Sequence, residues 1–292
     1  MHAMICSNKN YIEVMGVNFK IIGDSCCDFT KHDIDKGYFI NVPLTLTVGE
    51  VDVVDDESFE QNKFLKMMAD CDVCPKSSCP SPEAYIEKFD DAEDIYVVTL
   101  SAKLSGSFNS ALIARQIYLE DNPNVNIHVF DSKTAAAGQH LICEKIEECA
   151  LAGMDFKDVV STVDSYIKGM KTIFVLDDLD VMRMNGRISK VKSFAANMLN
   201  IKPVLYAVDG EIHQLDQARG MNKALNKLLW HIEKDGYDKT RKVIISQCDS
   251  RERCLNIKKI LIDKFDFKNV EILDGKGVTT MYGNKGGVIV AF

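Results

Sequence analysis

The sequence predicts an α/β protein of two domains, and three observations support that fold class. Apolar stretches such as "IYVVTL" and "NIHVFD" alternate with amphipathic stretches in the first half, a pattern typical of parallel strands joined by helices. The second half has two extended stretches joined at Asp209-Gly210, a strong hairpin signal. The 292 residues suffice for two ordinary domains. We therefore expect an N-terminal domain of three layers, with a parallel sheet between helices, and a C-terminal domain of mixed α+β type.

In the first half, the predicted strands are "VNFKII", "FINVPLTLTV", "IYVVTL" and "NIHVFD". A helix is expected between the last two, and the residues predicted on its buried face are Phe108, Ala111, Leu112 and Leu119. "AAAGQHLICEKIEECALAG" and "DFKDVVSTVDSYIKGM" predict two more helices. Residues 1–18 are expected to be an N-terminal extension, and the first domain is predicted to span residues 19–168.

In the second half, "KTIFVLDDL" predicts a strand, and a long amphipathic helix is expected from Met221 to Lys234 after the hairpin. The strands "KVIISQC", "VEILDG" and "GVIVAF" complete a mixed set. The second domain is predicted to span residues 169–292. The chain shows no low-complexity linker, so the two domains are expected to pack together with a cleft between them.

Composition and short motifs argue against several classes of function. The net charge of −8 disfavours a nucleic-acid partner. The sequence contains no run of 18 apolar residues, so no membrane-spanning helix is expected. The start, "MHAMICSNKNYIEVMG", lacks the pattern of a signal peptide. A cytoplasmic location with ten reduced cysteines is therefore expected. "CDVCPKSSCP" has one C-x2-C pair without the second pair of a zinc site, so neither a metal nor a cofactor is expected.

Hydroxyl-rich turns follow the predicted strands. "GDSCCD" contains Asp24 and Ser25, and "SAKLSGSFNS" contains Ser105 and Ser107. Any one of these side chains is explained by helix capping. Yet "SGSFNS" offers more hydroxyls than one cap uses, and the ends of parallel strands are where ligands gather. The turns suit one small anion, such as a carboxylate, bound by neutral donors.

Catalysis receives less support from the sequence. A serine nucleophile needs a nearby base, but no histidine adjoins a motif, and no phosphate-binding loop is present. No catalytic residue is therefore assigned. The alternative hypothesis is a hydrolase or a phosphotransfer enzyme that uses Ser105 or Asp24 at the cleft.

The motifs, taken in order, resemble those of the DegV family. They are "GDSCCD", "VPLTLTV", "SSCPSPEAYIEKF", "TLSAKLSGSFNSA", "VFDSKTAAAGQ", "FVLDDLDVMRMNGRIS" and "IKPVLYAVDGEI". These are bacterial fatty-acid-binding proteins, some of which serve as the binding subunit of a fatty acid kinase. The resemblance runs from about residue 19 to the C-terminus and implies a DegV-like fold of two α/β domains.

The resemblance also implies a ligand and its site. A long-chain fatty acid would lie in an apolar tunnel within residues 19–168, with its carboxylate near the cleft between the domains. Ser77 and Ser78 in "KSSCPS", together with Ser105, would lie at the carboxylate, with Ser107 close by. The tunnel would open near Ser78 and Ser105.

Two further places are implicated by the resemblance. In "TTMYGNKGG", Met281 follows Thr280 where the family usually has a histidine, so Met281→His is expected to tighten fatty-acid binding. The alternatives are that Tyr282 or Lys285 supplies the missing donor, or that Met281 fills an apolar gap. In "MNGRIS", Arg187 either lies near the binding and docking surface, as in the family, or is an exposed arginine at a structural turn. The prediction is a non-catalytic fatty-acid carrier, with a fatty acid kinase as its candidate partner and without stable membrane insertion.

Overall fold

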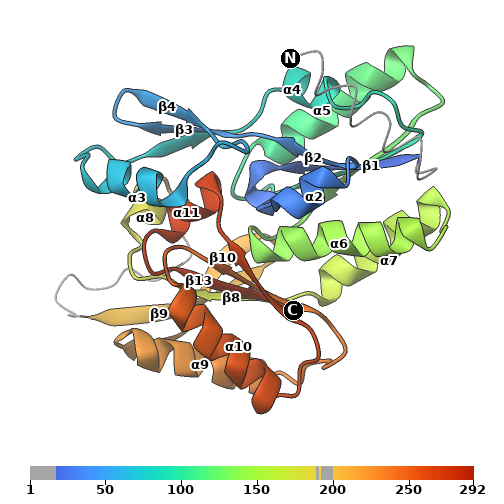
Figure 1. Ribbon diagram of the computed structural model, residues 1–292. Helices are drawn as coiled ribbons and strands as arrows, with labels where there is room; N and C mark the ends of the chain where they lie inside the picture. The colour runs from blue at the N-terminus through green and yellow to red at the C-terminus, as the bar shows by residue number, and fades with distance from the viewer. Residues whose placement is uncertain (1–17, 189–190, 192–199) are drawn as a thin grey trace.

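The computed structural model describes residues 18–188, residue 191 and residues 200–292. Most of the predicted N-terminal extension, residues 1–18, lies outside this range, as does part of the segment that follows Arg187. The described chain forms two large sheets and one small sheet, with helices between and around them (Figure 1).

The first sheet is parallel, as predicted. Its strands, in spatial order, are β2 (Phe39–Val42), β1 (Phe19–Asp24), β6 (Asp94–Thr99) and β7 (Asn126–Asp131). Both faces carry apolar side chains, because Ile21 and Tyr96 pack into one core while Ile22 and Ile95 pack into another. Strands that are buried on both faces have nearly continuous apolar sequences, so these strands could be predicted from the sequence.

Helices cover both faces of this sheet, which gives the expected three layers. On one face lie α4 (Pro82–Ile86) and α5 (Ser107–Asp121), and on the other lie α6 (Ala137–Leu151) and α7 (Phe156–Gly169). The buried face of α5 was predicted correctly for Ala111 but wrongly for Leu112, which is 37% exposed. The helix turns Ala114 to the sheet instead, because residues three apart share a face.

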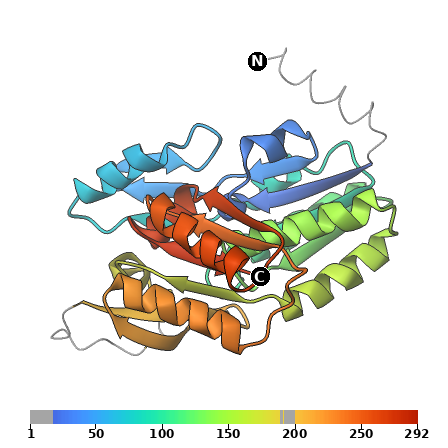
Figure 2. The ribbon, with the colours of Figure 1, turned by 60° about the horizontal axis from the view of Figure 1, so that its bottom comes forward.

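The predicted strand "FINVPLTLTV" is two strands in two sheets. β2 ends at Val42, and Pro43, which has no backbone N–H, separates it from β3 (Thr45–Val48). β3 pairs with antiparallel neighbours in a small third sheet, which Figure 2 shows beside the first sheet. The other members of this region are β4 (Val51–Val54), β5 (Lys76–Ser78) and α3 (Gln61–Ala69). Two short elements, η1 (Ser25–Cys27) and α2 (Lys31–Asp35), follow β1.

The second sheet is mixed, as expected for an α+β unit. In spatial order its strands are β10 (Glu211–Arg219), β9 (Ile201–Val208), β8 (Thr172–Val175), β13 (Val288–Ala291), β11 (Val243–Gln247) and β12 (Val270–Asp274). The hairpin at Asp209-Gly210 is confirmed, and both residues have positive φ angles of 47° and 85°. The predicted division into domains at residues 168 and 169 stays a prediction; that position lies at the end of α7, whose last residue is Gly169, and β8 begins at Thr172.

The second sheet has one outer and one inner face. Its outer face is covered by α9 (Met221–Lys234), which matches the predicted bounds, and by α10 (Arg251–Asp263). Its inner face packs on α6, where Ala137 and Leu141 contact Ile244 and Leu273. Helix α6 therefore lies between the two large sheets (Figure 1). Two short helices, α8 (Asp180–Met184) and α11 (Gly277–Gly283), complete this half.

Candidate functional site

A cavity of about 330 Å³ lies between the first and second sheets, within the size range of small-molecule sites. Most of its wall is apolar. Among the apolar residues that line it are Leu44, Leu100, Leu104, Phe174, Ile212, Val278 and Ile289. Such a wall suits an aliphatic ligand, because removing its surface from water is favourable.

The fold places this cavity at the carboxyl edge of the parallel sheet. The segments after β1, β6 and β7 contribute Cys26, Leu100 and Thr134, and this edge is where α/β sheets bind ligands. The opposite wall comes from β8, β10 and β13 of the second sheet, through residues such as Phe174 and Ile212. The cavity thus extends beyond residues 19–168, the range expected to enclose it, because the inner face of the second sheet closes it.

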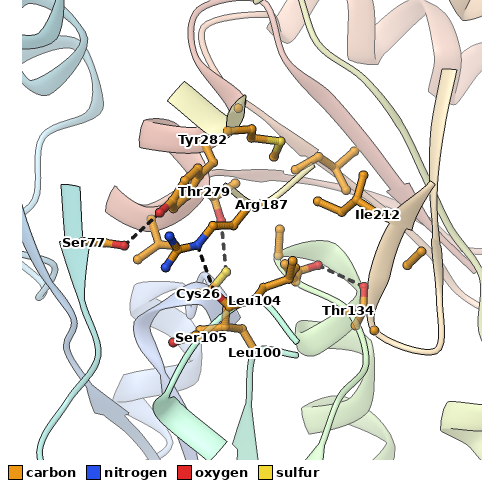
Figure 3. A pocket seen from close by; sticks show the side chains of 18 of the residues that line it. Cys26, Ser77, Leu100, Leu104, Ser105, Thr134, Arg187, Ile212, Thr279 and Tyr282 are labelled. Atoms are coloured by element: carbon orange, nitrogen blue, oxygen red, sulfur yellow. Dashed lines mark hydrogen bonds between the residues drawn. The ribbon is translucent and has the colours of Figure 1, made fainter. Parts of the chain in front are cut away.

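Polar groups gather at one end of the cavity. The hydroxyl oxygen of Ser77, on β5, lies 3.1 Å from the phenolic oxygen of Tyr282, on α11. Ser78, Ser105 and Arg187 also line the cavity. Figure 3 shows the guanidinium of Arg187 between Ser77 and Leu104. Sequence reasoning placed Ser77, Ser78 and Ser105 at one site, and the structure brings all three to this cavity.

Ser105 and Ser107 lie on either side of Gly106, the N-cap residue of α5. The Ser105 hydroxyl oxygen accepts a hydrogen bond from the Ser107 backbone N–H at 3.2 Å and lies 3.1 Å from the Ser107 hydroxyl. Ser105 thereby serves the start of α5, whose N-cap position is occupied by Gly106, which has no capping side chain. Ser105 also lines the cavity, whereas Ser107 is fully buried behind it. Ser105 therefore supports the start of the helix with its hydroxyl and also belongs to the cavity wall.

The Arg187 side chain is fixed by two backbone carbonyls. Its Nε donates to the Leu104 carbonyl at 3.1 Å, and one of its terminal nitrogens donates to the Asn185 carbonyl. A guanidinium carries five N–H donors in a rigid fork, so it can bind a carboxylate while keeping both bonds. Arg187 lies on the cavity wall and is half-buried. This position agrees with the interpretation that places it near the binding surface rather than with an exposed arginine at a turn.

Asp24 and Ser25 support the cavity wall from behind rather than line it. The buried Asp24 carboxylate accepts hydrogen bonds from the Leu100 N–H at 2.8 Å and from the Gln139 side-chain amide at 2.9 Å. Burial raises the pKa of Asp24 to about 6. The Ser25 hydroxyl accepts from the Leu44 N–H at 3.1 Å. Both side chains therefore hold segments that carry lining residues.

Thr280 and Met281 are fully buried and are not among the residues that line the cavity. The Thr280 hydroxyl donates to the Gly275 carbonyl at 3.0 Å, and Met281 packs in a core with Leu44 and Leu46. The residues of α11 that line the cavity include Thr279 and Tyr282. Residues three apart share one face of a helix, so Tyr282 rather than Met281 contributes to the polar end. A ligand role for Thr280 and Met281 stays a prediction.

Two buried aspartates that sequence reasoning did not select hold α11 in place. Asp28 accepts from the Lys276 N–H at 2.7 Å and from the Thr279 hydroxyl at 2.9 Å. Asp55 accepts from the N–H groups of Gly277 at 2.6 Å and Val278 at 2.9 Å. These carboxylates satisfy the backbone donors at the helix start. Asp28 stands inside the motif "GDSCCD", but only the folded chain shows its partner.

Both aspartates are removed from solvent. Burial raises the pKa of Asp28 to about 8, and the nearby Asp55 carboxylate adds to the shift. Burial likewise raises the pKa of Asp55 to about 6. Among the described residues, no group of three or more His, Cys, Asp or Glu side chains is arranged to hold a metal ion. Within the same part of the chain, no helix is both long and apolar enough to cross a bilayer.

The packed sheets and the mostly apolar cavity between them are those of a ligand-binding α/β protein. The family model described as "Uncharacterised protein, DegV family" matches residues 18–292, and the chain belongs to the DegV family. A DegV domain-containing protein of Streptococcus pneumoniae is 33% identical over 279 residues, which cover 94% of this chain and 99% of the relative.

Solved structures of the family share the fold. A DegV family protein from Ruminococcus gnavus, described with vaccenic acid, has a TM-score of 0.91 at 41% identity, covering 94% of this chain and 100% of its own. The Fatty Acid Kinase (Fak) B3 protein of Streptococcus pneumoniae, loaded with linoleic acid, has a TM-score of 0.87 at 32% identity, covering 94% and 99%. The predicted family and fold class are thus confirmed.

Proposed function

We propose that this protein binds a long-chain fatty acid in the cavity between its sheets, with the carboxylate at the polar end formed by Ser77, Ser105, Arg187 and Tyr282. The observation that carries the proposal is the distribution of groups on the wall. Aliphatic side chains line most of the cavity, and hydroxyls gather with a guanidinium at one end. That arrangement matches a molecule with one anionic end and a long apolar tail.

The solved relatives support the same ligand class. Their descriptions include vaccenic, linoleic and heptadecanoic acids, and the proteins that hold them share at least 27% of their residues with this chain. Those acids differ in length and unsaturation but have the carboxylate in common. The shared group is the one that the polar end would recognise.

Presentation of the acid to a partner kinase extends the proposal. Ser78 and Cys79 line the cavity beside the polar end and are exposed, so a carboxylate held there would lie close to the protein surface. A structural relative is described as the B3 protein of a fatty acid kinase. In this proposal, phosphoryl transfer occurs on the partner, which supplies the nucleotide and its metal. The cytoplasmic location stays a prediction.

The enzymatic alternative has less support. The described neighbours of the Ser105 hydroxyl include the Ser107 hydroxyl, which is not a base able to activate a nucleophile. Asp24 is buried behind the wall and holds backbone and amide donors. The solved relatives from Ruminococcus gnavus and Eubacterium eligens are described by the fatty acids that they hold. We therefore assign a binding role to this protein.

The proposal is tested with a fatty acid and the alcohol of the same chain. Delipidated wild-type protein should bind stearate more tightly than stearyl alcohol, and Arg187→Gln should remove most of that preference. Arg183→Gln is the matched control, because Arg183 is exposed and pairs with Asp180 outside the cavity. Equal affinity of the wild type for acid and alcohol would refute recognition of the carboxylate. Binding of neither would refute the lipid-binding proposal itself.

A further inference from the structure

A second polar group lies in the cavity, away from the first. Thr134 follows β7 and Thr172 begins β8, and their hydroxyl oxygens lie 2.8 Å apart. Both residues line the cavity. Figure 3 shows Thr134 on the opposite side of the cavity from Ser77. With the carboxylate at Ser77, the hydroxyls of this threonine pair would therefore meet the tail of the acid.

The surroundings leave the pair one open direction. Thr134 and Thr172 are 4% and 6% exposed. Helix α6 closes the space behind them, since a Cβ on Gly138 would lie 2.6 Å from the Thr134 hydroxyl oxygen and 2.9 Å from that of Thr172. The cavity wall beside them includes apolar residues such as Phe174 and Ile289. The remaining hydrogen-bonding capacity of the pair is thus directed at whatever fills the cavity.

The count of hydrogens defines that capacity. Two hydroxyls carry two hydrogens and four lone pairs. One hydrogen lies between the two oxygens, and the nearest recorded acceptor for the other is the Ala135 carbonyl, 3.4 Å from the Thr134 oxygen. That distance is beyond the usual range for a hydroxyl donor. The pair can therefore donate to a ligand oxygen or accept from a ligand hydroxyl.

Charges near the pair favour a neutral group over a second carboxylate. Lys133, which precedes Thr134 in the chain and also lines the cavity, is 3.6 Å from the Asp209 carboxylate. Glu211 also lines the cavity and would repel an anion. A hydroxyl on the acyl chain is uncharged, so it needs no cation and is not repelled by Glu211.

We propose that the Thr134–Thr172 pair recognises a hydroxyl on the acyl chain, so that the preferred ligand is a hydroxylated long-chain fatty acid. This inference rests on the proposed function, since it assumes the carboxylate at Ser77. An all-methylene tail leaves the pair without a polar partner in a desolvated site, and sites built to bond a hydroxyl disfavour analogues that lack it.

The test compares stearate with stearates hydroxylated at carbon 10, 12 or 18. The delipidated full-length protein should bind at least one of these about two- to tenfold more tightly than stearate, the gain of one neutral hydrogen bond. The 2-hydroxy acid is the matched ligand control, because its hydroxyl lies beside the carboxylate and away from the pair. Its affinity relative to stearate should not depend on Thr172.

Variants separate recognition from structural support. Thr172→Val should remove the preference for the hydroxylated acid, and Thr172→Ser, which keeps the hydroxyl, should retain it. Thr99→Val is the control, because this threonine is fully buried and does not line the cavity. It should leave the ratio of the two affinities unchanged even if it lowers the melting temperature.

Each outcome decides the inference. If the wild type binds stearate but none of the chain-hydroxylated acids more tightly, the inference is overturned and the proposed function stands. If Thr172→Val melts earlier but keeps the same preference, the pair only joins the two sheets and the inference again fails. If no fatty acid binds the wild type, the proposed function fails and takes this inference with it.

Discussion

The hydroxyl of Ser77 meets the phenol of Tyr282 at 3.1 Å, although 205 residues separate them in the chain. The contact joins β5 of the small third sheet to α11, across the polar end of the cavity. Neither residue alone makes an anion site. Ser105 and Arg187 line the same cavity, and in the proposed function all four residues donate to the carboxylate.

Tyr282→Phe tests the phenol directly. The variant keeps the ring and removes the hydroxyl, so it should bind a fatty acid about tenfold more weakly, since a hydrogen bond to a charged group contributes roughly 1.5–3 kcal/mol. Tyr237→Phe is the matched control, because its hydroxyl donates to the Phe265 carbonyl, away from the cavity. Titration of both delipidated variants with oleate measures the difference; equal affinities would exclude Tyr282 from the head-group site.

Ser105→Ala distinguishes a ligand contact from a helix cap. Loss of a carboxylate donor should weaken fatty-acid binding by about tenfold or more, whereas loss of a cap lowers stability by roughly 1 kcal/mol. Ser81→Ala provides the comparison, because Ser81 caps α4 through the Ala84 N–H and does not line the cavity. We expect both variants to lose stability and only Ser105→Ala to lose affinity. The same affinity in both would contradict a head-group role for Ser105.

Asp28 should make stability depend on pH between about 4 and 8. Burial raises its pKa from 3.8 to about 8, so the folded protein holds a proton that the unfolded chain releases. This stabilising contribution is complete below pH 4 and is lost as the pH rises through 8. Asp24 and Asp55, whose pKa values are each raised to about 6, make the same kind of contribution to stability, and theirs is lost as the pH rises through 6.

The free energy of unfolding, measured by urea denaturation from pH 6 to 8.5, isolates the contribution of Asp28. Wild-type stability should fall across this interval, and Asp28→Asn, which stays neutral, should show a smaller fall. The exposed Asp238→Asn is the control. Identical slopes for the wild type and Asp28→Asn would mean that Asp28 is ionised throughout.

Met281→His should destabilise the protein instead of tightening binding, contrary to the expectation from the sequence alone. Met281 is fully buried in an apolar core, where an imidazole leaves polar atoms without partners at roughly 1–3 kcal/mol each. Met184→His is the control, because Met184 is 62% exposed. Thermal melts should show a loss only for Met281→His, and fatty-acid affinity of the folded variant should not rise. A tighter-binding Met281→His protein would restore the original expectation.

Local patterns made much of the fold predictable. The hairpin at Asp209-Gly210 requires positive φ angles that those residue types tolerate, and the strands of the parallel sheet are buried on both faces. The break at Pro43 was visible in the sequence, but the change of sheet that follows it depends on pairing with β5.

The site was predictable where its residues follow strands. Ser105 stands after β6, at the edge where ligands collect, and Ser77 was found through the family resemblance. Tyr282 was considered only as a substitute for the missing histidine, and the pairing of Thr134 with Thr172 was not predicted. The positions of these side chains depend on which face of α11 and which edge of β8 meet the first sheet. Tertiary packing decides those choices, and spacing along the chain does not encode them.

The anchoring of α11 has a consequence for the order of folding. The carboxylates that complete the first turn of this helix belong to Asp28 and Asp55, which precede their partners in the helix by 248 and 222 residues and are synthesised long before it. Contacts that close such long loops form late in folding, because the chain loses conformational entropy before the contacts stabilise it. Tyr282 therefore reaches Ser77 only after α11 has been synthesised, so the contact between these two side chains forms after the first sheet has left the ribosome.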